Sequence, residues 1–393
     1  MKNVKDENKI LIMLAFFSIS IGLWENFRQL WLQLNNFNIG QISTTLSIAC
    51  LLSAICIFIG SVKIQLKEIK KFISITLLMK IVVMFLLFIN NNGNVPMIRV
   101  LIILDIILEK FIILSIYPLI ICIKKSDTLY SKRKLIEYLC RDVGVFIGGV
   151  TIGKTIIQLN INYNVLLFFS LIFTIISGLI LININVKNKN EKSKISFKYI
   201  VKDKITIIYL LYYFISSIAM SIALGLKILM LTNKLGFSDI TATNYLLIIG
   251  LIADLVGIIA LRWLTPKNDY VAITIKFVIR FVVYVLAFLI NSYIMSIIAI
   301  TWSILISTAY ENKTDAPYIN RIQNEYQIFF SNIRYMIWMM GNSIGLYFAG
   351  ITYQYGMNYM FGLSAIFMIF QIGLAYYLIH LRIVENTLYT KQN

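Results

Sequence analysis

The stretch Lys187–Lys204 reads KNKNEKSKISFKYIVKDK and contains seven lysines. Long apolar sequence lies on both sides of it, over 163–183 and 205–232. A membrane-crossing helix needs about 20 mostly apolar residues, and both flanking stretches are long enough. The basic stretch therefore predicts a polar linker between two membrane-embedded regions.

The composition of the whole chain agrees with a membrane protein. Of its 393 residues, 59% are hydrophobic and 14% are charged. Soluble globular chains contain about 45–50% apolar and about 25% charged residues. The composition argues against a soluble enzyme, a nucleic-acid-binding domain or a disordered chain. It predicts an all-α integral membrane protein.

Twelve apolar stretches are long enough to span a bilayer, six before the linker and six after it. They are 10–34, 40–62, 69–89, 96–123, 135–158, 163–183, 205–232, 240–262, 270–290, 293–311, 326–352 and 358–382. We therefore expect two six-helix bundles, over 1–186 and 205–393, joined by a cytoplasmic linker over 187–204.

The distribution of basic residues predicts the orientation of these spans. With the N-terminus inside, the inner segments carry 25 Lys and Arg residues, the outer loops carry one, Lys234, and ten lie within spans. Such an excess on one side is the positive-inside pattern. It predicts a multi-pass protein of a bacterial plasma membrane with both termini in the cytoplasm. The net charge of +18 then reflects topology and attraction to anionic lipid, and no nucleic-acid partner is expected.

Neither the cysteines nor the single histidine, His380, indicates a metal or cofactor site. The four cysteines lie in or beside apolar runs, without metal-ligand spacing: Cys50, Cys56, Cys122 and Cys140. Residues 148–155, GGVTIGKT, match the phosphate-loop pattern. That loop works between a strand and a helix in a water-accessible domain, whereas this match lies inside a span. We interpret it as chance, with the glycines allowing close helix packing. No disulfide framework, metal or cofactor is predicted.

Ionisable residues inside the spans carry the functional signal. An ionised side chain at the bilayer centre costs about 2.5–3.5 kcal/mol on insertion scales, so such groups face one another or a wet cavity. Eight of them are our candidate substrate- and proton-binding residues. They are Glu25, Arg28, Asp105, Glu109, Arg141, Asp142, Asp254 and Arg334.

Spacing along the helices refines this set. Asp105 and Glu109 are four residues apart and share a helix face. Two adjacent carboxylates raise each other's affinity for a proton, which suits a proton carrier. Glu25 and Arg28 are three residues apart and also share a face. They could form a structural pair instead of a binding site.

Several features resemble the major facilitator superfamily of secondary transporters. Besides the two sets of six spans, they are the Gly60-led basic loop after the second span, Arg99 early in the fourth and the glycine-rich run 144–153 in the fifth. Gly341 and Gly345 in the eleventh span repeat the spacing of Gly144 and Gly148, which indicates internal symmetry.

This resemblance implies a fold and roles for individual residues. Spans 1, 4, 7 and 10 would line a central cavity, backed by 2, 5, 8 and 11. Glu109 and Arg141 would resemble the acid and arginine of proton-coupled sugar symporters. Lys80, Lys276 and Arg280 would lie on peripheral spans 3 and 9, where they would snorkel or form ion pairs.

The sequence thus favours an alternating-access secondary transporter. We expect a monomer that couples protons to a small polar, anionic or zwitterionic solute, because bases outnumber acids within the spans by ten to six. The glycine-rich fifth span slightly favours export. The alternatives are a multidrug efflux antiporter and a non-transporting membrane sensor or assembly factor. No nucleophile–base pair lies at membrane depth, so no enzyme activity is expected.

Overall fold

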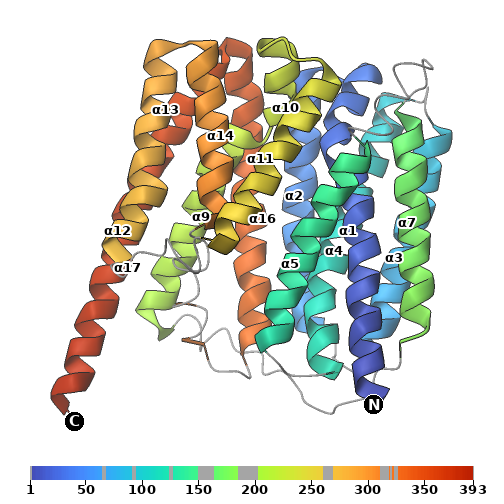
Figure 1. Cartoon of the computed structure of the whole chain (residues 1–393), viewed down its shortest axis with the longest axis horizontal. Coiled ribbons are helices and arrows are strands. Elements are labelled where there is room, and N and C mark those ends of the chain that lie inside the picture. Colours follow the sequence, from blue (N-terminus) through green and yellow to red (C-terminus); the bar gives the residue numbers. More distant parts are fainter. Residues whose placement is uncertain are drawn as a thin grey trace. The chain divides into compact units, whose positions relative to one another are not determined.

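The computed structural model describes residues 2–63, 68–90, 94–123, 127–148, 163–184, 202–259, 269–309, 318, 321–322 and 326–392. Within these ranges all regular elements are helices (Figure 1). The fold class predicted from composition, all-α with membrane-spanning helices, is confirmed.

The helices before the linker follow the predicted spans. They are α1 (Lys2–Leu34), α2 (Ile39–Lys63), α3 (Ile69–Ile89), α4 (Val95–Ile123), α5 (Asp127–Phe146) and α7 (Asn164–Ile182). The last part of the predicted fifth span, 149–158, lies outside the described residues, as does most of the phosphate-loop match.

The helices after the linker also follow the predicted spans, and two of them contain a π-helical turn. The elements are α9 (Lys204–Leu224), α10 (Lys227–Leu229), η3 (Met230–Lys234), α11 (Asp239–Ile259), α12 (Asp269–Ile273), η5 (Thr274–Val278), α13 (Ile279–Ile290), α14 (Tyr293–Ala309), α16 (Gln327–Tyr355) and α17 (Met357–Gln392). The turns η3 and η5 widen the helices of the seventh and ninth spans. Such turns recur at functional sites.

Eight helices in the described part of the chain are long and apolar enough to cross a membrane. They are Asp6–Glu25, Ile39–Ser61, Ile69–Ile89, Asn164–Ile182, Lys204–Lys234, Asp239–Val256, Asp269–Ile290 and Met357–Val384. The α14 helix adds a shorter apolar stretch, Tyr293–Ile306. The α4 helix is outside this group and carries four charged residues within 95–112.

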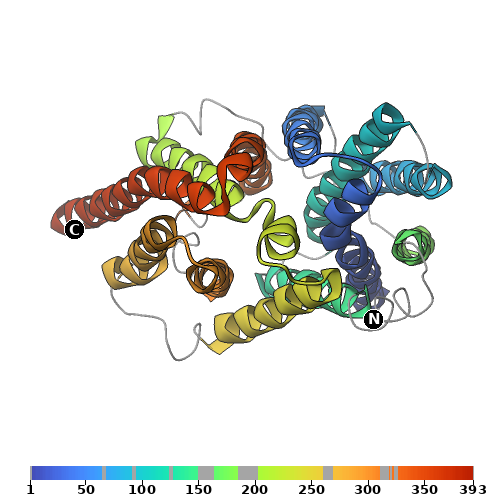
Figure 2. The same cartoon turned by 90° about the horizontal axis from the view of Figure 1, so that it is seen from above.

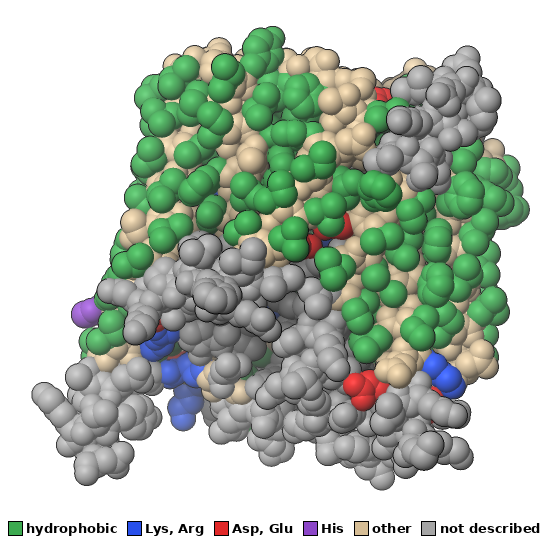
Figure 3. Space-filling view, viewed as in Figure 1, with side chains coloured by type: hydrophobic (Ala, Val, Ile, Leu, Met, Phe, Trp, Pro, Cys, Tyr) green, Lys and Arg blue, Asp and Glu red, His purple; other side chains and the backbone are tan. Residues whose placement is uncertain are grey.

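The surface of these helices is apolar, as a lipid-facing surface must be. On α3, Leu78 is 63% exposed and Met79 is 52% exposed. Figure 3 shows one face of the molecule, with hydrophobic side chains over most of the helix length and Lys and Arg near the end that carries the termini. A soluble monomer rarely exposes apolar area on this scale.

The contacts within the chain define two compact units. The first comprises residues 1–193 and 228–251, and the second comprises residues 194–227 and 252–393. The core of the first unit includes Phe17, Ile73 and Ile116, from α1, α3 and α4. The core of the second unit is rich in aromatic side chains, among them Tyr209 and Phe330.

Glycines permit the closest helix crossing in each unit. A Cβ at Gly144 on α5 would overlap the carbonyl oxygen of Ile19 on α1. In the second unit, a Cβ at Gly345 on α16 would lie only 2.6 Å from the carbonyl oxygen of Ile218 on α9. Small residues allow helix backbones to approach closely. Gly341, the counterpart of Gly144 by spacing, makes the same kind of contact, because a Cβ there would lie 2.6 Å from the carbonyl oxygen of Phe214 on α9. Glycines of α5 and α16 therefore perform the same packing role in α1–α5 and α9–α16.

Buried hydroxyl groups join a second pair of equivalent helices. Ser20 Oγ on α1 lies 2.8 Å from Ser170 Oγ on α7. Ser364 Oγ on α17 donates to the carbonyl oxygen of Ala219 on α9 at 2.7 Å. Figures 1 and 2 show α9 beside both α16 and α17. Each unit is thus built around its first helix, packed against the fifth and sixth helices of its own half.

Candidate functional site

Five charged side chains from α1, α3 and α4 meet inside the first unit; we call them the charge cluster. They are Arg28 on α1, Lys80 on α3, and Asp105, Glu109 and Lys110 on α4.

Asp105 and Glu109 are the shared acceptors of the charge cluster. Arg28 Nη2 lies 3.1 Å from Asp105 Oδ2 and 2.9 Å from Glu109 Oε2. Lys80 Nζ lies 2.5 Å from Asp105 Oδ1 and 3.8 Å from Glu109 Oε2. Lys110 Nζ lies 2.8 Å from Glu109 Oε1. Each carboxylate therefore contacts at least two cations.

The charge cluster is almost completely shielded from solvent. The Asp105 side chain is 0% exposed and that of Glu109 is 1% exposed, while Lys110, the most open member, is 17% exposed. Buried charges are tolerated when they are paired and hydrogen-bonded, and removing one partner is strongly destabilising. The five side chains comprise three cations and two carboxylates, so each carboxylate has the partners that make its burial tolerable.

Helical spacing explains how the sequence builds this cluster. Asp105 and Glu109 lie one turn apart on the same face of α4, as predicted. Lys80 belongs to the buried face of α3, in register with Ile73, Leu77 and Met84. Its ammonium group is therefore directed into the unit and is 2% exposed. The pairing alternative considered for Lys80 is the one that the structure shows.

The structure gives Glu25 and Arg28 different partners, although they share α1. Arg28 joins the charge cluster, whereas Glu25 forms an ion pair with Arg141 on α5. That pair is more open, with side chains 29% and 39% exposed. The acid paired with Arg141 is thus Glu25 on α1, whereas Glu109 contacts Arg28, Lys80 and Lys110.

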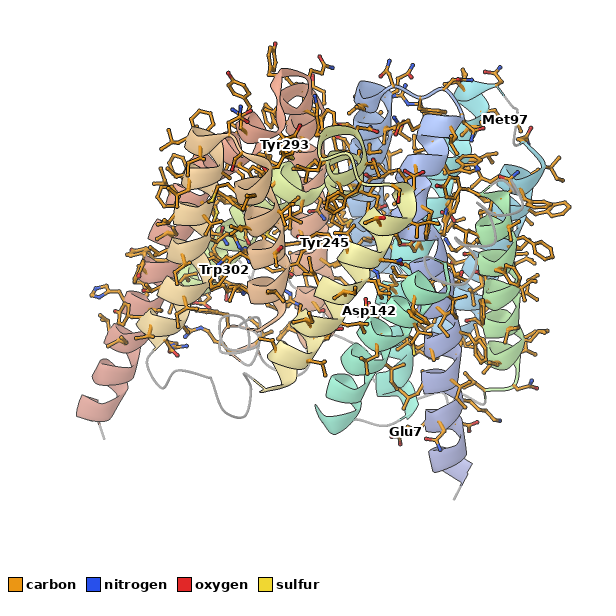
Figure 4. The ribbon with its side chains drawn as sticks, turned by 45° about the horizontal axis from the view of Figure 1, so that its top comes forward. Glu7, Met97, Asp142, Tyr245, Tyr293 and Trp302 are labelled. Carbon is orange, nitrogen blue, oxygen red and sulfur yellow. The ribbon has the colours of Figure 1, made fainter. Side chains whose placement is uncertain are left out.

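Asp142 lies next to Arg141 on α5 and is labelled in Figure 4. A Cβ at Gly250 on α11 would lie 3.5 Å from Asp142 Oδ1. The carboxylate therefore packs against the bare backbone of α11, within the first unit.

Arg334 lies in aromatic surroundings in the second unit. Its Nη1 donates to Tyr209 Oη at 3.2 Å, and its guanidinium lies 5.1 Å from the centre of the Tyr213 ring. The Tyr213 ring in turn lies 4.9 Å from that of Trp338 on α16. A guanidinium over an aromatic face is a favourable cation–π arrangement. Asp254, the remaining candidate, is half-buried on α11.

Two polar contacts link residues 33 and 163 to the segment 228–251. Gln33 and Asn233 exchange side-chain amide hydrogen bonds of 3.4 and 3.3 Å. Tyr163 Oη donates to Asp239 Oδ2 at 2.5 Å. Burial and this hydrogen bond raise the pKa of Tyr163, so the phenol keeps its proton. Gln33 lies near the C-terminal end of α1, and the Tyr163 ring lies 5.8 Å from that of Phe27 on the same helix.

Sequence reasoning missed two members of the charge cluster, Lys80 and Lys110. A usable signal existed for Lys80, because its spacing from Ile73, Leu77 and Met84 continues one buried helical face. For Lys110 the signal was only its position next to Glu109.

The described residues contain no group of three or more His, Cys, Asp or Glu side chains that could hold a metal ion. Cys50, Cys56 and Cys140 are free thiols. The charge cluster is held together by ion pairs and hydrogen bonds among its five side chains.

Comparison with known proteins gives matches in structure alone. No protein-family model matches the sequence, and no curated protein matches it significantly. The human organic anion transporter MFSD10 superposes with a TM-score of 0.66 at 10% identity, covering 95% of this chain and 100% of that one. The nucleoside transporter NupG gives 0.65 at 12% identity, covering 95% and 98%.

A variant of the E. coli fucose:proton symporter FucP gives a TM-score of 0.67 at 11% identity, covering 96% of this chain and 99% of that one. Likeness at such low identity reports on fold. These neighbours confirm the resemblance read from the span pattern: the chain has the fold of the major facilitator transporters.

Proposed function

We propose that this protein is an alternating-access secondary transporter that couples protons to the movement of a small polar, anionic or zwitterionic solute. The observation that carries the proposal is the charge cluster, which buries two carboxylates among three cations on three helices of one unit. Ionisable groups at membrane depth mark ion and proton pathways.

Protonation of a carboxylate in the charge cluster can replace its ion pair with a neighbouring cation. Arg28 and Lys110 both contact Glu109. Attraction from these cations opposes protonation of Glu109 in the conformation described, so a proton would bind Glu109 as the helices rearrange, cancel its charge and weaken its hold on both cations. Because Glu109 is on α4 and Arg28 is on α1, the packing of α1 against α4 would then change. A proton thereby favours one arrangement of the helices over another, which is the requirement for coupling.

The excess of bases over acids within the spans, ten to six, supports the proposed solute class. More cations than carboxylates at membrane depth favour an anionic or zwitterionic solute over a cationic one. The glycine-packed α1–α5 crossing is the feature behind the weaker proposal of export, and a monomer in a bacterial plasma membrane completes the proposal.

Proton flux in proteoliposomes tests the function. Purified protein is reconstituted with a pH-sensitive dye inside, and small organic anions, amino acids and sugars are added one at a time. We expect at least one solute to move protons with the wild-type protein and none to do so with Glu109→Gln. Glu68→Gln is the matched control, because Glu68 is exposed at the start of α3 and makes no capping hydrogen bond.

The same vesicles separate the alternatives. Flux driven by lipophilic cationic dyes, with none from anions or zwitterions, would indicate a multidrug antiporter. A sensor or assembly factor would move no protons with any solute, and its cellular phenotype would survive Glu109→Gln and Asp105→Asn. Either result would contradict the proposal.

A further inference from the structure

Arg280 on α13 is a buried cation without a carboxylate partner among the described residues. It is 2% exposed. Its Nη1 contacts the Met220 sulfur at 3.1 Å, and its Nη2 donates to the carbonyl oxygen of Ser303 at 3.2 Å. Its Nε–H has no acceptor in the part of the chain that the structure describes. A thioether sulfur and a backbone carbonyl oxygen that already accepts a helical hydrogen bond are both uncharged, so neither neutralises the guanidinium. Arginine stays protonated in proteins, so a full positive charge is buried here.

The first unit has a neutralised counterpart of this position. Lys80 and Arg280 each follow the first residue of their helical span, Ile69 and Asp269, by 11 residues. The partner of Lys80 is Asp105, which follows the start of α4 by 10 residues. The contact of Arg280 is Ser303, which follows the start of α14 by 10 residues. The second unit thus keeps the cation and replaces the carboxylate with a serine.

The free edge of the guanidinium indicates which ligand fits. Nε and Nη2 form the side of the guanidinium that binds a carboxylate through two parallel hydrogen bonds. Nε–H is unused, and Nη2 has two protons for a single acceptor. Ser303 on α14 also donates through its Oγ to Tyr284 Oη on α13 at 2.7 Å, and this pair of hydroxyl groups is neutral. Trp302, labelled on α14 in Figure 4, marks the turn that carries Ser303.

We propose that Arg280 binds the carboxylate of the transported solute. This carboxylate takes the place beside Arg280 that Asp105 takes beside Lys80 in the first unit. This inference rests on the proposed function. Only 2% of Arg280 is exposed, so the site is occluded in this conformation, and the solute enters through the rearrangement of an alternating-access cycle. The π-helical turn η5 ends two residues before Arg280 and is a place where this helix can change register.

Ligand-dependent unfolding of the purified protein in detergent tests the inference. Melting temperatures are measured against acetate, glycolate and succinate, with chloride replacing them at the same sodium concentration. We expect a saturable rise for at least one carboxylate in the wild type, because a ligand stabilises the state that binds it. In Arg280→Gln the apparent Kd should rise at least tenfold. Arg280→Lys, which keeps the charge and loses the fork, should fall between them.

The unliganded variants provide a second readout. Removing a buried charge that has no partner should raise the melting temperature, so Arg280→Met should melt above the wild type without carboxylate. Lys202→Gln, which removes one charge at an exposed position of the same unit, should change neither the melting temperature nor the Kd.

Equal carboxylate Kd values for the wild type and Arg280→Gln would overturn the inference, and so would a lower melting temperature for Arg280→Met. The absence of any saturable carboxylate effect in the wild type would also overturn it. If Arg280 binds carboxylate but no solute drives protons, the proposed function fails and the site stands. If protons move normally in Arg280→Gln, only the inference fails.

Discussion

The pair α3–α4 and the pair α13–α14 occupy equivalent places in their halves of the chain, yet they treat buried charge in opposite ways. In α3–α4 the Lys80 ammonium is held by Asp105 at 2.5 Å. In α13–α14 the Arg280 guanidinium meets a sulfur and the backbone oxygen of Ser303. The backbone framework is repeated while the charge balance is not. The comparison indicates that the first half neutralises its buried cation with its own carboxylate, whereas the second half leaves its buried cation for an anion from outside.

The largest effect should come from breaking the neutralised side. Lys80→Met leaves Asp105 facing Arg28 alone. We expect a loss of about 3 kcal/mol in unfolding free energy, at the lower end of the range for breaking a buried pair, because Arg28 remains. Denaturant unfolding in detergent measures it, with Lys71→Met, an exposed lysine of the same helix, as the control.

Lys80→Met combined with Asp105→Asn should regain part of this loss, since no unpaired charge is then left by the change. Losses that simply add in the double variant would show that Lys80 and Asp105 do not act as a pair.

Adding a carboxylate partner for Arg280 in the second unit should raise the free energy of unfolding instead of lowering it. Ser303→Asp places a carboxylate on the turn that Arg280 already contacts. We expect it to stabilise the protein by about 1.5–3 kcal/mol, the range for a hydrogen bond to a charged group, and to abolish carboxylate binding. A melting temperature below that of the wild type, with binding retained, would break the proposed equivalence. Ser364→Asp is the control, because Ser364 is equally buried on α17 but donates to Ala219.

The two glycine crossings test whether the repeated framework is equally tight in both halves. Gly144→Ala and Gly345→Ala should each destabilise by about 1–3 kcal/mol, because the added methyl group meets backbone atoms of the neighbouring helix. Gly178→Ala and Gly373→Ala have open space for the methyl group and should be neutral or slightly stabilising, since alanine is the better helix former. Similar thermal stabilities for all four variants would refute the close-crossing account.

The smallest effect concerns the start of the second half, where Asp203 caps α9. Its carboxylate accepts hydrogen bonds from the Ile205 backbone, Thr206 and Arg321. Burial opposes ionisation, but these bonds prevail, and the hydrogen bond from Arg321 is the strongest of them in lowering the pKa of Asp203.

A lowered folded-state pKa means that this stabilisation is complete above the usual aspartate value of about 3.9 and is lost as pH falls through the lower folded value. Asp203→Asn keeps a capping oxygen but loses the ion pair with Arg321, and should cost roughly 0.2–1 kcal/mol at pH 7. The difference between wild type and variant should shrink below about pH 4. A difference that stays constant from pH 7 to pH 3 would argue against an ionised cap.

The sequence was sufficient for the architecture and insufficient for the pairing of charges. Span positions follow from hydropathy, and the correspondence of Gly144 with Gly341 follows from the spacing of the glycines. Arg28, Asp105 and Glu109 were recognised as buried charges because insertion cost alone identifies them. Their partners were not predictable. Glu25 and Arg28 share a helix face but form ion pairs with different helices. Which partner each one meets depends on how α4 and α5 are rotated relative to α1. That rotation cannot be read from one sequence.

The lysine and arginine of spans 3 and 9 show the same limit. Lys80 and Arg280 were expected on peripheral spans, either reaching toward the interface or forming ion pairs. Both lie on the buried face of their helix, at 2% exposure, and Lys80 forms the ion pair with Asp105. The spacing of Lys80 from its apolar neighbours was the available evidence, and it outweighs the expectation drawn from helix position.

Infrared difference spectroscopy of membranes containing the protein, between pH 8 and pH 5, tests most directly whether the charge cluster takes up the proton. The account predicts that a carboxylate band disappears while the carbonyl band of a buried carboxylic acid grows, and that this exchange is lost in Glu109→Gln or Asp105→Asn but kept in Glu68→Gln. Identical difference spectra for the wild type and both cluster variants would contradict it, because the proton would then reside elsewhere.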